Sequence, residues 1–493
     1  MADPARTPVL VGIGTATRRE DDPLRALDPL ALMIEAAHAA GADAHAPALL
    51  ARLDRVLVPG GRWSHSNPGR AIGQAIGAPG VHSVLSTVGV LQQTLMGAAC
   101  AAIAAGDIRS ALVAGGDAGF RLLRARIAGV ELPPLPEAES EPDEVLAPKE
   151  ELRHPAEIRA GLRMPVSLYA ILESAYRARH GWTVAEHRDR LAALYARFST
   201  VAAGNPDAWT RKPLGAAMIR DASERNGMQA FPYTKLHCSS WNVDQAAALL
   251  FCSEAAADEA GVPSDRRVYP WASTESNHMV AVTARPELGT CAGAAIAGRA
   301  ALEPFGLSGR QLDLVELYSC FPVAVETYAD ALKLDLEQDL TVTGGMPFAG
   351  GPYNNYVLQS TARMGRLLRD SGARKGLVSS VSGVLTKQGF GLWSTTPPEG
   401  GFRWTDVTAQ VATSIGAGRD VLAGYAGPGR IAGYTVSREP NRPITAIAVA
   451  DLENGMRALA TATDPATVAA FEGDHELVGA VLQVDGESFR LAV

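Results

Sequence analysis

Residues 84–106, "VLSTVGVLQQTLMGAACAAIAAG", place the strongest constraint on the fold of this chain. A strand-like apolar run meets a turn at Gly89, and a strongly apolar helical run then continues to Gly106. A further strand-like segment, "SALVAGGDAG", follows at 110–119. A strand, a buried helix and a second strand in this order predict a layered α/β core.

The turn at Gly89 has the form of a seat for a nucleophile, because a helix N-terminus favours an anion. However, the turn carries Gly89, Val90 and Leu91, with no Cys, Ser or His. Cys100 lies ten residues beyond Val90, about 15 Å along a helix. We therefore interpret Cys100 as a small buried apolar residue and the seat as lacking a nucleophile.

The second half of the chain contains a unit similar to residues 90–111. A glycine turn at Gly351 precedes a helical segment, a turn with glycine and basic residues, and a strand near Leu377. This similarity predicts an internal duplication, with one α/β half over 1–262 and another over 263–410. Two ordinary loop–helix–strand units are the alternative.

The sequence also predicts an insertion in the first half, a core helix after it and a separate C-terminal module. Residues 120–225 begin with an acidic, proline-rich stretch and continue with amphipathic helices, which indicates a helical insertion in the first half. Residues 244–260 are predicted to be a core helix. Residues 411–493 show short alternating strands around one short helix near 464–473, which predicts a small, OB-like β-barrel.

Composition limits the classes of protein to which the chain can belong. The 493 residues suffice for roughly three domains. The formal net charge of −8 argues against a nucleic-acid binder. We expect no membrane span and no signal peptide. The five cysteines form no CxxC pair, so we expect a cytoplasmic protein without a disulfide framework. No His, Cys and carboxylate spacing suggests a metal site.

Several motifs together resemble one family. They are "PVLVGIG" at 8–14, "FPYTKL" at 231–236, "LVELYSCFP" at 314–322 and "GGPYNNY" at 350–356. In their order and spacing they are similar to the thiolase superfamily, and in particular to thiolase-like proteins of the sterol-carrier-protein thiolase type, described as acetyl-CoA acetyltransferase-like. The resemblance covers residues 7–410 and implies a thiolase fold, with two duplicated βαβ halves in a layered α/β/α core. The C-terminal β module is an addition to it.

The resemblance implies where the reactive groups of a thiolase would lie, and this chain lacks most of them. The nucleophilic cysteine would fall at Val90, and the histidine of the family's GHP motif near Gly351. A second cysteine would fall within 380–382, where the chain has serine and valine, and a further histidine at Gln388. Gln359, on the following helix, is no general base. These losses predict weak or absent thiolase activity, since the Claisen reaction proceeds through an acyl-enzyme.

The loop Tyr318-Ser319-Cys320 matches the family's HDCF loop. By this resemblance Cys320 is a candidate acid/base, and the alternative is a buried cysteine at the end of a strand. Some relatives without the nucleophile resemble retro-aldolases acting on CoA thioesters of sterol side chains, and they use tyrosines. Tyr318 matches the first of those positions and Tyr356 resembles the second. The alternative for Tyr318 is a packed, hydrogen-bonded core tyrosine.

Three hypotheses for function therefore remain open: a degenerate thiolase of lipid metabolism, a tyrosine-dependent retro-aldolase, and a non-catalytic CoA or acyl-CoA binding protein. The resemblance implies CoA or an acyl-CoA as substrate or ligand, and no tightly bound cofactor. It implies a possible homodimer, with a monomer left open. The insertion would face the nucleotide, and its basic residues Arg153, Arg159 and Arg163 are either ligand contacts or ordinary surface charges.

Overall fold

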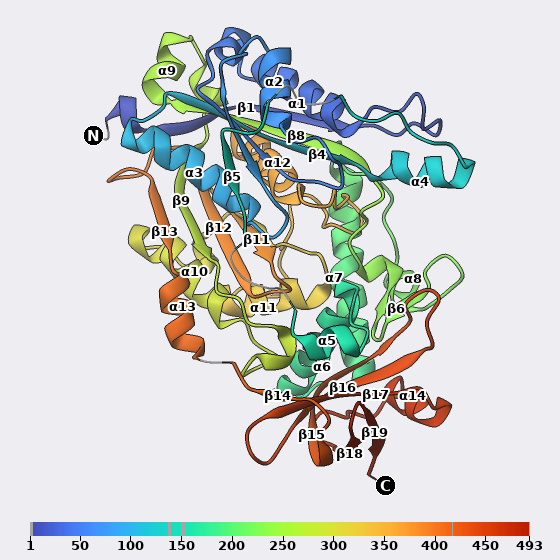
Figure 1. Cartoon of the computed structure of the whole chain (residues 1–493). Helices are drawn as coiled ribbons and strands as arrows, with labels where there is room; N and C mark the ends of the chain where they lie inside the picture. Colours follow the sequence, from blue (N-terminus) through green and yellow to red (C-terminus); the bar gives the residue numbers. More distant parts are fainter. Residues whose placement is uncertain (1–2, 137–139, 149–152, 417, 493) are drawn as a thin grey trace.

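Two mixed β-sheets form the core of the molecule, and a separate β-barrel lies at the C-terminal end (Figure 1). The computed structural model describes residues 3–136, 140–148, 153–416 and 418–492. The acidic, proline-rich stretch predicted as a surface excursion includes 137–139 and 149–152, which lie outside the described residues.

The first sheet has six strands in the order β1-β8-β4-β2-β3-β5. Strand β8 runs antiparallel to both β1 and β4, whereas β4, β2, β3 and β5 are mutually parallel. The strands are β1 (Pro8–Thr17), β2 (Arg55–Pro59), β3 (His82–Ser86), β4 (Ser110–Ala118), β5 (Glu144–Leu146) and β8 (Asp244–Ser253).

The second sheet has five strands in the order β10-β11-β12-β9-β13. Its strands are β9 (Tyr269–Ser276), β10 (Leu314–Glu316), β11 (Lys375–Ser382), β12 (Lys387–Ser394) and β13 (Arg403–Asp406). The run β9-β12-β11-β10 repeats the run β1-β8-β4-β2 of the first sheet, with two antiparallel pairs followed by a parallel pair. The duplication predicted from the sequence is therefore confirmed at the level of topology.

Helices cover the outer faces of the sheets and also fill the space between them. The outer helices are α1 (Pro29–Asp43), α2 (Pro68–Ala75) and α9 (Glu254–Glu259) on the first sheet, and α10 (Ala292–Leu302), α11 (Pro322–Leu332) and α13 (Thr408–Ile415) on the side of the second. The two middle helices are α3 (Gln92–Ala105) and α12 (Tyr356–Asp370), which contact both sheets. Among the described residues, no helix is long and apolar enough to span a membrane.

The chain between β4 and β8 forms the insertion in the first half, which confirms its mostly helical character. Its helices are α4 (Gly119–Ala128), α5 (Pro155–Arg159), α6 (Pro165–Arg179), α7 (Val184–Gly204) and α8 (Ala216–Arg220). Two short strands near its end, β6 (Met228–Ala230) and β7 (Tyr233–Thr234), extend the sheet of the C-terminal barrel. The insertion is therefore bonded to the barrel as well as to the core.

The C-terminal module is a closed five-stranded barrel. Each strand pairs with two neighbours in the ring β15-β16-β17-β19-β18, and β18 pairs again with β15. The elements are β14 (Val421–Leu422), β15 (Ala426–Ser437), β16 (Thr445–Asp451), β17 (Arg457–Ala462), α14 (Pro465–Phe471), β18 (Val481–Asp485) and β19 (Ser488–Leu491). This confirms the predicted small β-barrel, and one helix lies between its third and fourth strands, as predicted around 464–473.

The helix predicted over residues 244–260 is wrong for most of its length. Residues Asp244–Ser253 form strand β8, and only Glu254–Glu259 are helical. The segment is rich in alanine and leucine, which favour helices, but β8 lies between β1 and β4 and is buried on both faces. A strand covered on both faces shows no alternation of polar and apolar residues, so its sequence resembles that of a buried helix.

Arg457 of β17 fastens the barrel to the second half of the core. Its side chain is 2% exposed and donates to the carbonyl oxygens of Thr283 at 3.3 Å and Pro286 at 3.2 Å, and also to that of Arg285. Its Nε donates to Asp451 at 2.7 Å. The guanidinium group therefore supplies hydrogen bonds to buried backbone carbonyl oxygens at the junction of barrel and core, where no neighbouring strand pairs with them.

We expect an Arg457→Met variant to loosen the barrel from the core. The substitution retains apolar volume but leaves buried carbonyl oxygens without a donor, so it should lower stability by about 3 kcal/mol. The measurement is the first thermal unfolding transition, together with the rate of limited proteolysis at the barrel junction. Arg490→Met, at an exposed position of β19, is the matched control and should change neither. Equal stability of the two variants would show that Arg457 does not fasten the barrel.

Candidate active site

The predicted seat lies where the sequence places it, between the end of β3 and the start of α3. Gly89 has φ 106°, a conformation that side-chain-bearing residues rarely adopt, and it turns the chain into the helix. Leu91 is the N-cap residue of α3, and its side chain makes no capping hydrogen bond. No N-cap side chain therefore accepts from the first N–H groups of the helix, which lie at the turn. The residue beside these N–H groups is Val90, which carries no reactive atom.

The second half of the chain contacts this seat directly. The carbonyl oxygen of Gly89 accepts a hydrogen bond from Lys387 Nζ at 3.1 Å and from Ser382 Oγ at 3.3 Å. Ser382 belongs to the segment 380–382, where a second cysteine is expected by family resemblance. The fold therefore brings Ser382 next to the turn that carries Val90. It also places Lys387 there, and this lysine is only 4% exposed.

The position expected for a histidine, Gly351, is tightly packed. A Cβ atom at Gly351 would lie 2.1 Å from Ser239 Oγ and 3.0 Å from the Met346 side chain. The Gly351 N–H also donates to the carbonyl oxygen of Ser240 at 2.9 Å. Any side chain at this position would require the Ser239 hydroxyl group to move.

A glutamine connects the N-termini of the two middle helices. Gln92, the first residue of α3, accepts from the N–H of Val357 in α12 at 2.7 Å and donates to Asn354 Oδ1 at 3.3 Å. Asn354 in turn donates to the carbonyl oxygen of Gly60 at 3.0 Å. The two helix N-termini, which would carry the two halves of a thiolase site, therefore meet in this chain through amide groups.

The loop Tyr318-Ser319-Cys320 joins the same region. The Cys320 carbonyl oxygen accepts from the Ser239 N–H at 3.1 Å, and Ser319 Oγ accepts from the Met346 N–H at 3.0 Å. The rings of Tyr318 and Tyr356 pack edge to face with their centroids 5.6 Å apart. The structure thus brings Tyr318, Cys320 and Tyr356 close to the Gly351 loop, as the family pattern implies.

The hydroxyl group of Tyr356 is held in a closed network. It donates to Glu316 Oε1 at 2.5 Å and lies 2.7 Å from Thr343 Oγ1. Glu316, which is fully buried, also accepts from the N–H groups of Val342 at 2.6 Å and Thr343 at 2.9 Å. The cavity next to Tyr356 measures about 10 Å³, which is room for about one water molecule.

Burial dominates the ionisation of all three candidate residues. It raises the pKa of Tyr356 far above its ordinary value, and the Glu316 carboxylate raises it further. The pKa of Tyr318 is raised by burial and then by Cys320. Burial also raises the pKa of the Cys320 thiol to about 12. All three groups are therefore neutral near pH 7, and none has the lowered pKa that a poised base requires.

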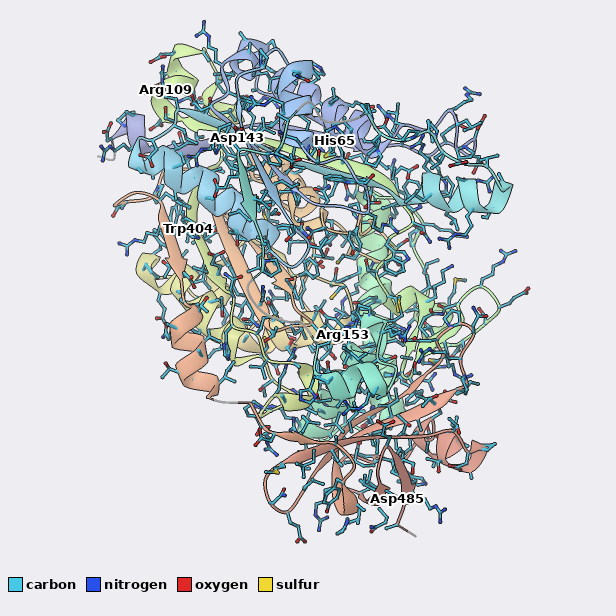
Figure 2. All side chains as sticks on the ribbon, viewed as in Figure 1. His65, Arg109, Asp143, Arg153, Trp404 and Asp485 are labelled. Carbon is cyan, nitrogen blue, oxygen red and sulfur yellow. The ribbon has the colours of Figure 1, made fainter. Side chains whose placement is uncertain are left out.

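The other residues singled out in the sequence have structural contacts. Cys100 is 1% exposed in the core, in agreement with the prediction. Gln388 donates to the Leu385 carbonyl oxygen at 2.9 Å. Arg153, labelled in Figure 2, donates to the backbone carbonyl oxygens at 162 and 163. Arg159 pairs with Glu487 of the barrel at 3.1 Å. These contacts favour a structural interpretation of Arg153 and Arg159.

Sequence reasoning missed Glu316 and Lys387. A signal exists for Glu316, because a single carboxylate interrupts the apolar run "LVELY" at 314–318, and such a residue is rarely buried without partners. Lys387 gives no comparable signal, since its contact with Gly89 joins residues 298 positions apart.

Solved structures with this architecture are known, although the chain matches no protein-family model. A monomeric SCP2-thiolase-like protein type 1 from Mycobacterium smegmatis is 29% identical, with both chains covered completely and a TM-score of 0.83. The Ltp2–ChsH2(DUF35) aldolase is 17% identical over 80% of this chain and 99% of that one, with a TM-score of 0.61. Human mitochondrial 3-ketoacyl-CoA thiolase in complex with CoA is 17% identical over 80% and 98%, with a TM-score of 0.56.

A cysteine placed at the seat should be reactive. In a Val90→Cys variant the thiol would lie at the α3 N-terminus, near the Lys387 ammonium group, and both stabilise a thiolate. We expect iodoacetamide to label it at pH 7 about 10-fold faster than the thiol of Val88→Cys. Val88 is the control because it is 48% exposed and lies before the turn. Mass spectrometry distinguishes both from the five native cysteines.

The native cysteines should contribute little background, because Cys100, Cys252 and Cys320 are buried. Labelling of Val90→Cys at or below the rate of Val88→Cys would show that the seat does not stabilise an anion.

Proposed function

We propose that this chain, which is a thiolase-superfamily protein of the SCP2-thiolase-like kind, binds acyl-CoA thioesters of lipid metabolism and does not catalyse thiolysis through an acyl-enzyme. The observation that carries the proposal is the α3 N-terminus, which has the geometry of a nucleophile seat but carries Val90. Valine can neither attack a thioester nor transfer a proton, so the covalent route is closed.

The surroundings of Val90 support the same conclusion. Gly351 and the segment 380–382, where the partner groups are expected, hold no histidine and no cysteine. Without a nucleophile, general acid/base assistance contributes only about 10² to 10⁴ in rate. The retained features are the helix N-termini and backbone turns, which bind and orient a ligand, while the groups that form and break bonds are absent.

Location and oligomeric state are part of the proposal. All five cysteines are unpaired, which supports a reducing, cytoplasmic setting. Strand β5 covers the outer edge of β3, and Asp143 fastens it by accepting from Ser83 N at 2.7 Å and Ser83 Oγ at 2.9 Å. The sheet therefore ends on β5, a strand of three residues, and a short edge strand resists pairing with a second copy of the sheet, so between the two open alternatives we favour a monomer.

The proposal predicts binding without thiolysis. Purified protein incubated with acetoacetyl-CoA and CoA should form acetyl-CoA at least about 10³-fold more slowly than an active thiolase assayed in parallel, as expected when a nucleophile is missing. The same preparation should show a ligand-dependent rise in unfolding temperature with acetyl-CoA. Turnover at the rate of the active thiolase would refute the first expectation. Absence of binding by acetyl-CoA and by longer acyl-CoA thioesters would refute the second.

A retro-aldolase is the second candidate, favoured by the contact between Tyr318 and Tyr356. In this reaction a base removes the β-hydroxyl proton of a 3-hydroxyacyl-CoA. The Cα–Cβ bond then breaks, a carbonyl compound leaves, and the enolate of the shortened thioester takes up a proton. No acyl-enzyme is required. Two observations count against this candidate. The Tyr356 hydroxyl group already donates a hydrogen bond to Glu316, and the pKa of Tyr356 is raised.

Tyrosine variants test this second candidate. If the reaction occurs, Tyr318→Phe and Tyr356→Phe should each abolish cleavage of a 3-hydroxyacyl-CoA, because each removes the only transferable proton of its side chain. Tyr353→Phe is the control, since Tyr353 lies in the loop directly before Tyr356 but packs against Arg62. Product formation is followed by mass spectrometry. Cleavage that persists in both test variants excludes the tyrosine mechanism, and no cleavage by the unaltered protein excludes the activity.

A further inference from the structure

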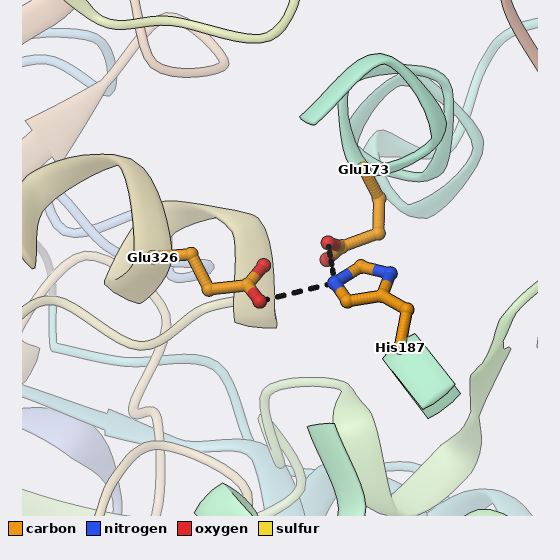
Figure 3. Close-up of side chains that lie close together, drawn as sticks. All are labelled: Glu173, His187 and Glu326. Atoms are coloured by element: carbon orange, nitrogen blue, oxygen red, sulfur yellow. Dashed lines mark hydrogen bonds and ion pairs between the residues drawn. The ribbon is translucent and has the colours of Figure 1, made fainter. Parts of the chain in front are cut away.

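Glu173, His187 and Glu326 form a buried cluster at the meeting of three helices (Figure 3). Glu173 lies on α6, His187 on α7 and Glu326 on α11, and their side chains are 0%, 0% and 1% exposed. His187 Nε2 lies 3.1 Å from Glu173 Oε1 and 3.1 Å from Glu326 Oε1. One atom from each residue lies within 4.8 Å of the other two.

The hydrogen bonds of the cluster leave some of its buried polar atoms without a partner. His187 Nε2 carries at most one hydrogen, yet it faces an oxygen of each of two carboxyl groups. Glu326 Oε2 and His187 Nδ1 have no hydrogen-bond partner among the described residues. Two carboxyl groups buried beside one imidazole are costly unless their charge is compensated and their oxygens are bonded.

We propose that these three side chains bind one divalent transition-metal ion, of the class of Zn²⁺ or Mn²⁺. Imidazole nitrogen and carboxylate oxygen are ligands that such ions accept, and no thiolate is needed. The charge balances, because a 2+ ion with a neutral imidazole neutralises two carboxylates. The second oxygen of one carboxylate, such as the unpartnered Glu326 Oε2, supplies a fourth ligand atom.

The surroundings of the cluster fit a structural metal site. Tyr233 donates its hydroxyl hydrogen to Glu173 Oε2, and this bond orients the carboxylate for coordination through its other oxygen. The Trp182 ring lies 5.4 Å from the His187 ring and covers it. No ligand side chain is more than 1% exposed, so the site would be closed to substrate, as structural sites are.

A bound ion would fasten the helical insertion to the second half of the core. Helices α6 and α7 belong to the insertion, whereas α11 begins at Pro322, directly after the loop that contains Cys320. The ring of Tyr233 also stacks on Phe321 with the centroids 5.7 Å apart. The metal site would therefore hold the Tyr318–Cys320 loop in place from behind, whether or not that loop is catalytic.

The sequence could not indicate this site, and the expectation of no metal was drawn from spacing alone. His187 and Glu326 are 139 residues apart, and no motif of ligand spacing connects them. Only the packing of α11 against the insertion brings the third ligand into place.

The test uses the full-length, untagged protein. After treatment with a chelator and dialysis, it is incubated with ZnCl₂ or with MnCl₂, and the bound metal is measured by inductively coupled plasma mass spectrometry. We expect about one ion per chain and a rise in unfolding temperature of several degrees with at least one of the two ions. His187→Gln and Glu326→Gln should each lose the bound ion and the temperature rise.

His180→Gln is the matched control, because His180 also faces a carboxylate, Asp330 at 3.1 Å, but is 28% exposed. It should bind metal like the unaltered protein. The proposal is overturned if the unaltered protein takes up neither ion and its unfolding temperature does not respond to either. It is equally overturned if folded Glu326→Gln and His187→Gln retain the ion. The measurement on the unaltered protein decides the question even if both variants fail to fold.

Discussion

The burial of helices α3 and α12 between two sheets is the constraint on which the rest of the structure depends. Helix α3 contacts a sheet on either side, and beyond its first turn it is apolar or small, as Ala99, Cys100 and Ile103 show. In α3 the polar side chains are confined to the first turn, and at the start of both helices the first N–H groups have no partner within the helix. In this chain those ends meet through Gln92, which contacts Asn354 and the Val357 N–H.

This arrangement allows residues at the helix ends to differ among proteins that share the fold. By the family resemblance, a cysteine is expected at Val90 and a histidine at Gly351. Both positions lie in turns, outside the faces of the middle helices that pack against the sheets. Gly351 is even packed tightly against Ser239. Stability comes from the layers and function from the loops, so similarity of fold does not by itself establish an activity.

The sequence predicted the parts of the structure that depend on local pattern. Gly89 and Gly106 mark the bounds of α3, and the repeated turn–helix–strand unit indicates the second half. Prediction failed for β8, because a strand buried on both faces looks like a buried helix. It also could not give the environment of Tyr356. The hydrogen bond to Glu316 joins residues 40 positions apart. Such partners determine the pKa of a phenol and whether its hydroxyl hydrogen is available for transfer.

The insertion and the barrel limit the freedom of the loops at the candidate site. The barrel contacts the insertion through Ser437, whose hydroxyl lies 3.1 Å from that of Ser167, and through Tyr434, which accepts from Arg177 at 2.8 Å. It contacts the second half through Arg457. Because the barrel is bonded on both sides, the insertion cannot swing away from the second sheet without breaking buried polar contacts. The loops between these bodies are therefore anchored on both sides. If the chain binds a ligand as proposed, such anchoring lowers the entropic cost of binding.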